Sequence, residues 1–267
     1  NILIKENVFR ADSTEGILLL GSTNILIKNN KIMNNGKYGI RATQSTLRIS
    51  KNELKGNLKE GIRVINSKVK IDSNIVENNG KFGINLSLCD SIKIVGNTVN
   101  NNKHHGILCK NSKDVVIEKN KLSHNKNGIY VRNSEGKIIY NLISHSRQYG
   151  IYARSGTKFL VKNNTIVKNR LSGVLAIEGA DLKLLNNIIA FNGWGIVTVI
   201  EGYSPGTATT EFNCLWGNKS ANYAGITDTT KNIRKNPLFI DEEKDFRLKE
   251  NSPCIGKGKN GENIGAF

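Results

Sequence analysis

The chain has 267 residues and 38% of them are hydrophobic, which is enough for one large domain with a buried core. Only three prolines and an aromatic content of 6% argue against a disordered or linker-rich chain. No apolar window reaches the ~18 residues of a transmembrane helix. The net charge of +17 favours a polyanionic partner, unless lysine and asparagine are simply the preferred solvent-facing residues of this chain.

A repeat of 22 or 23 residues begins in the first residues and organises most of the chain. Each repeat contains an asparagine that opens an N-x-aliphatic stretch, and a second asparagine five residues later, replaced only by Asp12 and Ser146. Each repeat also contains a Gly-Ile or Gly-Val pair. The glycines of these pairs are Gly16, Gly39, Gly61, Gly83, Gly106, Gly128, Gly150, Gly173 and Gly195.

Apolar residues alternate within each repeat, as in Ile40 and Ala42 on either side of Arg41. This period of two indicates short strands with one buried face, and no segment shows a sustained helical period. Three short strands and three turns per repeat predict a coil of a parallel β-solenoid, with neighbouring coils about 4.8 Å apart. Stacked asparagines would then hydrogen-bond from coil to coil, and each glycine would supply either a special backbone conformation or a close approach.

The repeated frame N-x-I-x-x-N-x-x-x-G-I-x-[apolar] resembles the right-handed parallel β-helix repeat of the pectate-lyase-like superfamily, which includes NosD-like proteins. Residues 236–267 resemble the closing segment of some secreted polysaccharide lyases. The resemblance implies an all-β, single-stranded right-handed parallel β-helix of about ten coils of 22–23 residues. We therefore expect a β-helix over residues 1–217 and a closing segment, packed on the last coils, over residues 218–267. It also implies a protein that is secreted or displayed at the cell surface.

The first residues repeat an internal frame, because residues 1–9 match residues 24–32. The chain is therefore expected to start within a coil, without an N-terminal cap. We expect upstream sequence or a partner to cover this end, since an uncapped solenoid exposes strand edges and apolar core. The stretch NILIKENVF also lacks the basic and apolar regions of a signal peptide.

Side chains two and four residues after each repeat glycine should point outward and form columns along the solenoid. One column contains Lys110, Arg132 and Arg154 on three consecutive coils, and Tyr130 and Tyr152 lie beside the two arginines. Like charges at this spacing repel unless an anion lies between them, and arginine suits a carboxylate. The pattern predicts a site for an acidic polysaccharide; the alternative is a solvated face whose aromatic stacks only stiffen the sheet.

Further substrate-binding positions are predicted on the same face, where cations could bind carboxylates and aromatic rings could pack on sugar rings. The aromatic members lie one residue before a repeat glycine and would form the wall of a groove. These predicted positions are Arg41, Arg63, Tyr38, Phe82, Tyr149 and Trp194.

If the protein is an enzyme, the resemblance to polysaccharide lyases implies β-elimination. Arg132 or Arg154 would neutralise the uronate carboxylate and so lower the pKa of the adjacent carbon-bound proton. A tyrosine beside two arginines is expected to have a lowered pKa, which suits a base. The candidate bases are Lys110, Tyr130, Tyr152 and His105.

Three non-lyase functions remain open at the level of the sequence. One is a non-catalytic carbohydrate-binding or structural module of a larger extracellular protein, because this fold carries many functions. Another is a NosD-like role in metal handling. Nucleic-acid binding has the least support and would show a steep dependence on salt.

Two pairs of residues are candidates for metal binding. His124 and His145 share one phase of the repeat, so their imidazoles should stack and could hold a metal ion. Glu178 and Glu201 lie on consecutive coils, away from the arginines, and could contribute to a Ca²⁺ site like that of calcium-dependent lyases. Neither pair supplies enough ligands to assign a metal, so Ca²⁺ stays only a candidate cofactor.

Several other signatures are absent from the sequence. The four cysteines show no C-x-x-C spacing and therefore no metal-site signature, although Cys214 and Cys254 could form a bridge. The outward columns lack the paired or triple aspartates of glycosidases with this fold. The D-P-x-H-D motif of its epimerases is also missing, so the sequence favours neither of these two enzyme classes.

Overall fold

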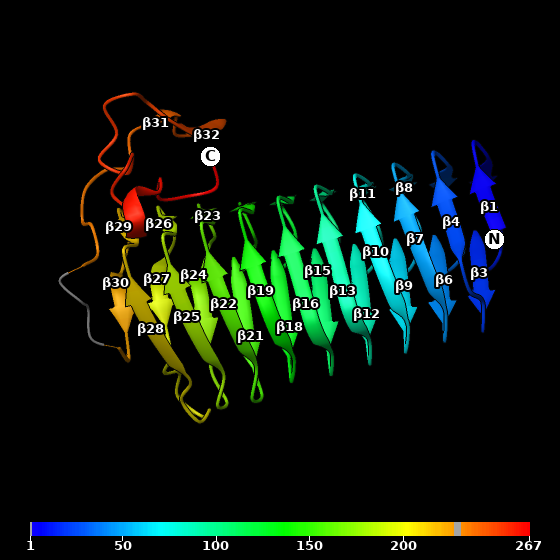
Figure 1. Ribbon diagram of the computed structural model, residues 1–267, viewed down its shortest axis with the longest axis horizontal. Helices are drawn as coiled ribbons and strands as arrows, with labels where there is room; N and C mark the ends of the chain where they lie inside the picture. Colours follow the sequence, from blue (N-terminus) through cyan, green and yellow to red (C-terminus); the bar gives the residue numbers. More distant parts are fainter. Residues whose placement is uncertain (1, 227–230) are drawn as a thin grey trace.

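The computed structural model describes residues 2–226 and 231–267. Asn1 and residues 227–230, which the sequence assigns to the first coil and the closing segment, lie outside the described part. The described chain winds into a parallel β-solenoid whose coils stack along one long axis, with a C-terminal tail folded beside the last coils (Figure 1). No helix among the described residues is long and apolar enough to cross a membrane.

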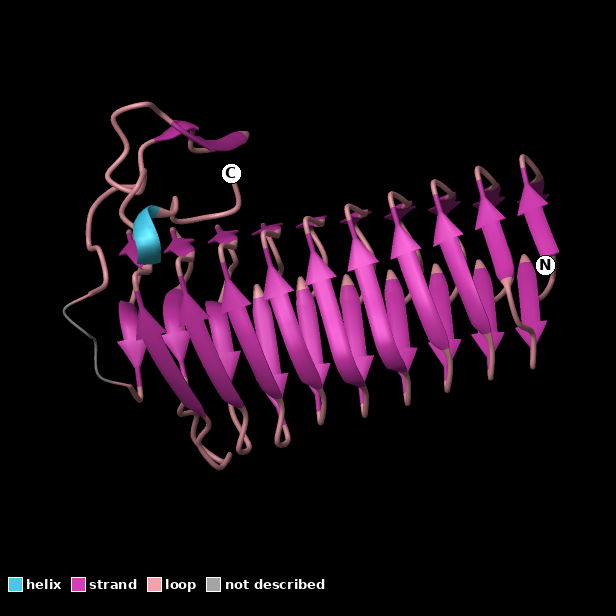
Figure 2. Cartoon of the chain, viewed as in Figure 1, coloured by secondary structure: helices cyan, strands magenta, loops and turns pink. Residues whose placement is uncertain are grey.

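Three parallel sheets of ten strands each run the length of the solenoid (Figure 2). Sheet A consists of β1 (Ile2–Lys5), β4 (Ile25–Lys28), β7 (Thr46–Ser50), β10 (Lys68–Asp72), β13 (Asp90–Val95), β16 (Lys113–Glu118), β19 (Glu135–Ile139), β22 (Lys158–Lys162), β25 (Asp181–Leu185) and β28 (Thr207–Glu211). Sheet B consists of β2 (Val8–Arg10), β5 (Lys31–Met33), β8 (Glu53–Lys55), β11 (Ile75–Glu77), β14 (Thr98–Asn100), β17 (Lys121–Ser123), β20 (Leu142–Ser144), β23 (Thr165–Val167), β26 (Ile188–Ala190) and β29 (Cys214–Trp216).

Sheet C carries the predicted site. It consists of β3 (Ile17–Leu20), β6 (Ile40–Thr43), β9 (Ile62–Ile65), β12 (Ile84–Ser87), β15 (Ile107–Lys110), β18 (Ile129–Arg132), β21 (Ile151–Arg154), β24 (Ser172–Ala176), β27 (Trp194–Val197) and β30 (Ala221–Ala224). β30 lies beyond residue 217, and the division into two parts at that residue stays a prediction.

Alternating side chains fill the interior, as the period of two predicted. In β6, Ile40 and Ala42 are fully buried, whereas Arg41 and Thr43 are partly exposed. The isoleucine or valine after each repeat glycine stacks on the next one, as Ile62 does on Ile84. Burial of such a side chain contributes roughly 1.5–3 kcal/mol, so this column stabilises the stacking of each coil on its neighbours.

The predicted asparagine ladder is confirmed at the corner between sheets A and B. Asn52 donates its backbone N–H and its Nδ2 to Oδ1 of Asn74, at 2.9 and 3.0 Å. Asn74 in turn donates Nδ2 to Oδ1 of Asn97 at 2.9 Å and to the carbonyl of Ile49 at 2.9 Å. The residue before each ladder asparagine has a left-handed backbone, for example Ser73 with φ 58°, which turns the chain sharply between the two sheets.

The repeat glycines are required for closeness rather than for a special conformation. Gly61 does not have a positive φ. A Cβ on Gly61 would lie 2.6 Å from Cγ1 of Val76 and 2.9 Å from the carbonyl oxygen of Gly83. Of the two explanations that the sequence allowed, the close approach of stacked coils is therefore the correct one.

The C-terminal tail packs on the last strands of sheet B, and Figure 1 shows it beside β23, β26 and β29. It contains the antiparallel pair β31 (Phe239–Asp241) and β32 (Asp245–Leu248), followed by the short 3₁₀ helix η1 (Lys259–Gly261). The carboxylate of Glu262 binds Nζ of Lys162 at 2.9 Å and Nδ2 of Asn186 at 2.9 Å. Cys214 and Cys254 are buried free thiols, and a hydrogen bond between them raises the pKa of Cys214.

Candidate functional site

The predicted cation column exists on the outer face of sheet C. Lys110 is the register partner of Arg132, and Arg132 is the register partner of Arg154. Lys110 and Arg132 are exposed, and neither has an ion-pair partner among the described residues. The structure therefore brings these three side chains together on adjacent strands, as the repeat spacing predicted.

Arg154 differs from the other two cations because it already has a carboxylate partner. Its Nε lies 2.9 Å from Oε2 of Glu178, and its Nη2 bonds the other carboxylate oxygen. Ser155 donates its hydroxyl to the same carboxylate at 2.7 Å, and these bonds hold the pKa of Glu178 below its ordinary value. The expectation that Glu178 lies away from the arginines was wrong, because its side chain reaches back to the preceding coil.

Five rings on the outer face of sheet C form one continuous series, which we call the aromatic row. The rings of Tyr130 and Tyr152 stack with centroids 4.8 Å apart and an interplanar angle of 16°. His105 stands edge-on to Tyr130 at 4.8 Å, and Tyr149 is 5.3 Å from Tyr152. Phe82 completes the row by stacking on His105 at 5.3 Å.

The protonation behaviour of the row differs from the prediction. Burial raises the pKa of Tyr152 and outweighs the opposing charge of Arg154, so the expected lowered pKa was wrong for this residue. Burial also lowers the pKa of His105 to about 3, with the charge of Lys126 acting in the same direction. His105 is therefore neutral near pH 7, and its buried Nδ1 has no hydrogen-bond partner among the described residues.

The predicted cations nearer the N-terminal end of sheet C are also paired. Arg41 lies 3.6 Å from Glu15, and Arg63 lies 3.3 Å from Glu60. The ring of Tyr38 lies beneath the guanidinium of Arg41 at 5.7 Å. Both glutamates were missed in the sequence analysis. Each lies one residue before a repeat glycine, which is the same position as that of the predicted aromatic side chains.

The candidate metal ligands lie apart from the cation column. The rings of His124 and His145 stack as predicted, at 5.1 Å and 3°. The backbone N–H of Glu178 bonds the carbonyl of Ser204, so Ser204 rather than Glu201 lies opposite it. Nowhere in residues 2–226 and 231–267 do three or more His, Cys, Asp or Glu side chains gather in a way that could hold a metal ion.

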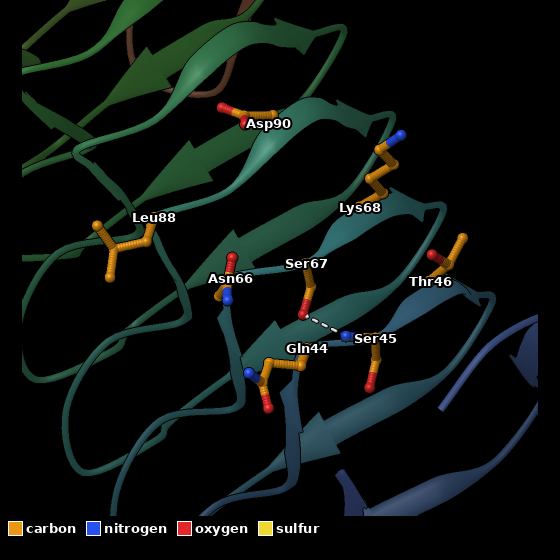
Figure 3. Close-up of a pocket in the computed structure, with 8 residues that line it drawn as sticks. All are labelled: Gln44, Ser45, Thr46, Asn66, Ser67, Lys68, Leu88 and Asp90. Atoms are coloured by element: carbon orange, nitrogen blue, oxygen red, sulfur yellow. Dashed lines mark hydrogen bonds between the residues drawn. The ribbon is translucent and has the colours of Figure 1, made fainter. Parts of the chain in front are cut away.

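A polar hollow of about 460 Å³ lies elsewhere, along the turns that join sheets C and A (Figure 3). The backbone N–H of Ser45 donates to Oγ of Ser67 there at 2.9 Å, which continues a serine ladder between coils. Its other lining residues include Lys68 and Asp90. None of the predicted site residues lines it, so we assign it to the architecture of the turns.

Comparisons with known proteins agree with this architecture. The family profile described as "Right handed beta helix region" matches residues 1–114 and 82–237. A double mutant of the periplasmic alginate epimerase AlgG superposes with a TM-score of 0.56 at 18% identity, over 88% of this chain and 75% of that chain. The catalytic unit of a thermostable α-1,3-glucanase from Streptomyces thermodiastaticus gives 0.55 at 13% identity, over 79% of this chain and 50% of that chain.

These structural likenesses establish the fold alone, because the identities are low. The chain spans half the length of the glucanase unit that it matches. No curated protein matches the sequence.

Proposed function

The chain belongs to the right-handed β-helix family, and we propose that the outer face of sheet C binds an acidic polysaccharide. The observation that carries the proposal is the pair of exposed, unpaired cations Lys110 and Arg132 on adjacent strands. Two neighbouring cations repel each other, and a bound carboxylate between them removes this cost. The planar guanidinium of Arg132 also suits two-point contact with a carboxylate.

The aromatic row supports a sugar ligand rather than a small inorganic anion. Its rings follow the long axis of the solenoid beside the cations, so a chain of sugar rings could pack on them while its carboxylates meet Lys110 and Arg132. The AlgG epimerase is named for its action on alginate, and the glucanase for its action on a glucan. These names lend support at the level of the fold only.

A second candidate function, β-elimination, is favoured by His105. This imidazole touches Tyr130 beside the cation column, but a pKa of about 3 makes it a weak base in the free protein, so the negative charge of a bound polyuronate would have to raise that pKa before it could accept a proton. Arg132 would neutralise the uronate carboxylate, and His105 would take the proton from the adjacent carbon. The bond to the leaving oxygen then breaks as a carbon–carbon double bond forms, and that oxygen takes a proton from a hydroxyl such as that of Tyr130. The raised pKa of Tyr152 disfavours it as the base.

The non-catalytic module remains the alternative to catalysis, and an extracellular location stays a prediction. A role of the stacked pair His124 and His145 in metal handling is a separate proposal. Loss of metal binding in His124→Ala would support that role, whereas the polysaccharide proposal expects no change in glycan affinity in this variant.

Calorimetric titration with polygalacturonate, alginate, hyaluronan and uncharged dextran tests the binding proposal. We expect binding of at least one acidic polymer and not of dextran, and we expect Arg132→Ala to weaken that binding by about fivefold, the effect of losing one charged contact on an exposed face. Lys93→Ala is the matched control, because Lys93 is an exposed cation on sheet A. The titrations are made at 0.15 M salt, where equal losses in both variants would contradict a site on sheet C.

Catalysis has a separate readout in the ultraviolet absorbance of an unsaturated product. If the protein catalyses β-elimination, the absorbance rises when an acidic polymer is added, and His105→Gln abolishes this rise without abolishing binding. A polymer that binds without any rise in absorbance leaves the non-catalytic module as the correct function.

A further inference from the structure

A cavity of about 330 Å³ lies on the outer face of sheet C next to the last strands of the solenoid. Tyr149, Ser172 and Trp194 are among the residues that line it. Leu171, Val197 and Ile200 supply further apolar surface. Of the predicted site residues, only Tyr149 and Trp194 line this cavity.

The spacing of the two aromatic side chains follows from the stacked coils. Ser172 is the register partner of Trp194, and the carbonyl of Ser172 accepts a bond from Gly150, the residue after Tyr149. Tyr149 and Trp194 are therefore two coils apart, about 9.6 Å at the usual strand spacing. A ring stacked between theirs would need this spacing, and the intervening position holds a small serine that is 4% exposed. We call the space bounded by Tyr149, Ser172 and Trp194 the ring slot.

The lining of the ring slot suits an uncharged ligand. None of its lining residues carries a charge, and burial keeps the pKa of Tyr149 above its ordinary value, so its phenol stays neutral. A carboxylate here would lose its water without gaining a partner, which is costly. The hydroxyl of Ser172, to which no described residue hydrogen-bonds, offers one polar contact at the base of the slot.

The ring slot is continuous with the aromatic row, because the rings of Tyr149 and Tyr152 are 5.3 Å apart. Ser172 begins β24, two strands beyond Arg132 in β18, a distance of about 9.6 Å along the axis. A single glycan chain could therefore reach from the unpaired cations to the ring slot. The two places differ in charge, so they would accept different sugars.

The geometry points to a binding site for an uncharged sugar residue of low polarity, such as a deoxy sugar, between Tyr149 and Trp194. This inference rests on the proposed function and deepens it: the polysaccharide is a heteropolymer in which an acidic residue meets Lys110 and Arg132 and a neutral one enters the ring slot. Trp194, which is 38% exposed in the free protein, becomes covered when the sugar binds. A polymer of uronates alone leaves the ring slot empty.

Tryptophan fluorescence and ligand-observed NMR with simple glycosides test the ring slot directly. The chain has two tryptophans, so a Trp216→Phe background makes Trp194 the only reporter. We expect methyl rhamnoside and methyl glucoside to shift the emission of Trp194 and to receive saturation transfer, and methyl glucuronide to need at least tenfold more ligand. An equal response to the glucuronide, or no response to any glycoside at the highest soluble concentration, overturns the inference.

A substitution that fills the ring slot, compared with the same substitution elsewhere on sheet C, tests the position of the site. Ser172→Leu occupies the space between the two rings and should abolish the response to methyl rhamnoside. Ser87→Leu makes the same change on the same face of sheet C, in β12, and should leave the response intact. If Ser172→Leu still responds, or if both variants lose the response, the ring slot is not the binding site. Polyuronate titration is a separate measurement, so a failure of the acidic site and a failure of the ring slot are distinguishable.

Discussion

Arg132 and Arg154 occupy equivalent positions on neighbouring strands, yet only Arg154 is held by a carboxylate. Glu178 therefore competes with an acidic ligand for Arg154. We predict that Glu178→Gln raises the affinity for an acidic polysaccharide by about fivefold, the effect of one additional charged contact at an exposed face. Calorimetric titration measures the change. Glu201→Gln removes the same charge from an exposed loop position, so an equal gain in that variant would assign the effect to net charge instead.

The same ion pair makes a prediction about pH. The pKa of Glu178 is lowered from its ordinary value of 4.5, first by its bond to Arg154 and then by its bond to Ser155. A group with a lowered pKa in the folded state contributes stability above its unfolded pKa and loses that contribution as the pH falls through its folded pKa. Denaturation midpoints of the native protein and Glu178→Gln should therefore differ above about pH 4.5 and converge in stronger acid. A difference that persists when the carboxyl is protonated would exclude this ion pair as its cause.

At the scale of the structural elements, the turn between sheets A and B depends on one buried amide in each coil. Asn74 is 1% exposed, and its side chain bonds the coils on both sides. We predict that Asn74→Ala lowers the free energy of unfolding by about 3 kcal/mol, because it leaves several buried backbone and amide groups without partners. Denaturant titration measures the loss. Lys93→Ala on the exposed face of β13 should change stability by less than about 0.5 kcal/mol, and a similar loss there would contradict the role of the ladder.

The strands of sheet C also show why the columns could be predicted and their partners could not. A period of two and a fixed repeat determine that Lys110, Arg132 and Arg154 share one column, since in-register stacking makes residues 22 or 23 apart neighbours. Glu178 lies just beyond the strand in a left-handed turn conformation, where the repeat does not fix the direction of a side chain. The raised pKa of Tyr152 was likewise unpredictable, because it depends on the balance of burial against the charge of Arg154.

The ring slot needed the structure for a different reason. Trp194 and Tyr149 were predicted to belong to one groove wall, but the lengthened turn that contains Ile200 interrupts the repeat at this point. Packing of that turn on Leu175 and Ile177 turns an open sheet face into a cavity. A sequence repeat predicts what recurs in every coil, whereas this cavity arises where one coil departs from the rest.

At the scale of the whole molecule, the net charge of +17 attracts any polyanion. Binding at the proposed site on sheet C must therefore be distinguished from this non-specific attraction. The salt concentration distinguishes the two, because the Debye length falls from about 30 Å at 0.01 M to about 8 Å at 0.15 M. At low salt, cations on all three sheets contribute to the binding of polygalacturonate, and Arg132→Ala and Lys93→Ala should weaken it to similar extents. At 0.15 M only charges near the bound chain still act on it, so the effect of Lys93→Ala should disappear while that of Arg132→Ala remains. Calorimetric titration of both variants at the two salt concentrations measures this divergence; if the two variants stay equal at 0.15 M, the attraction belongs to the basic surface as a whole and sheet C has no specific site.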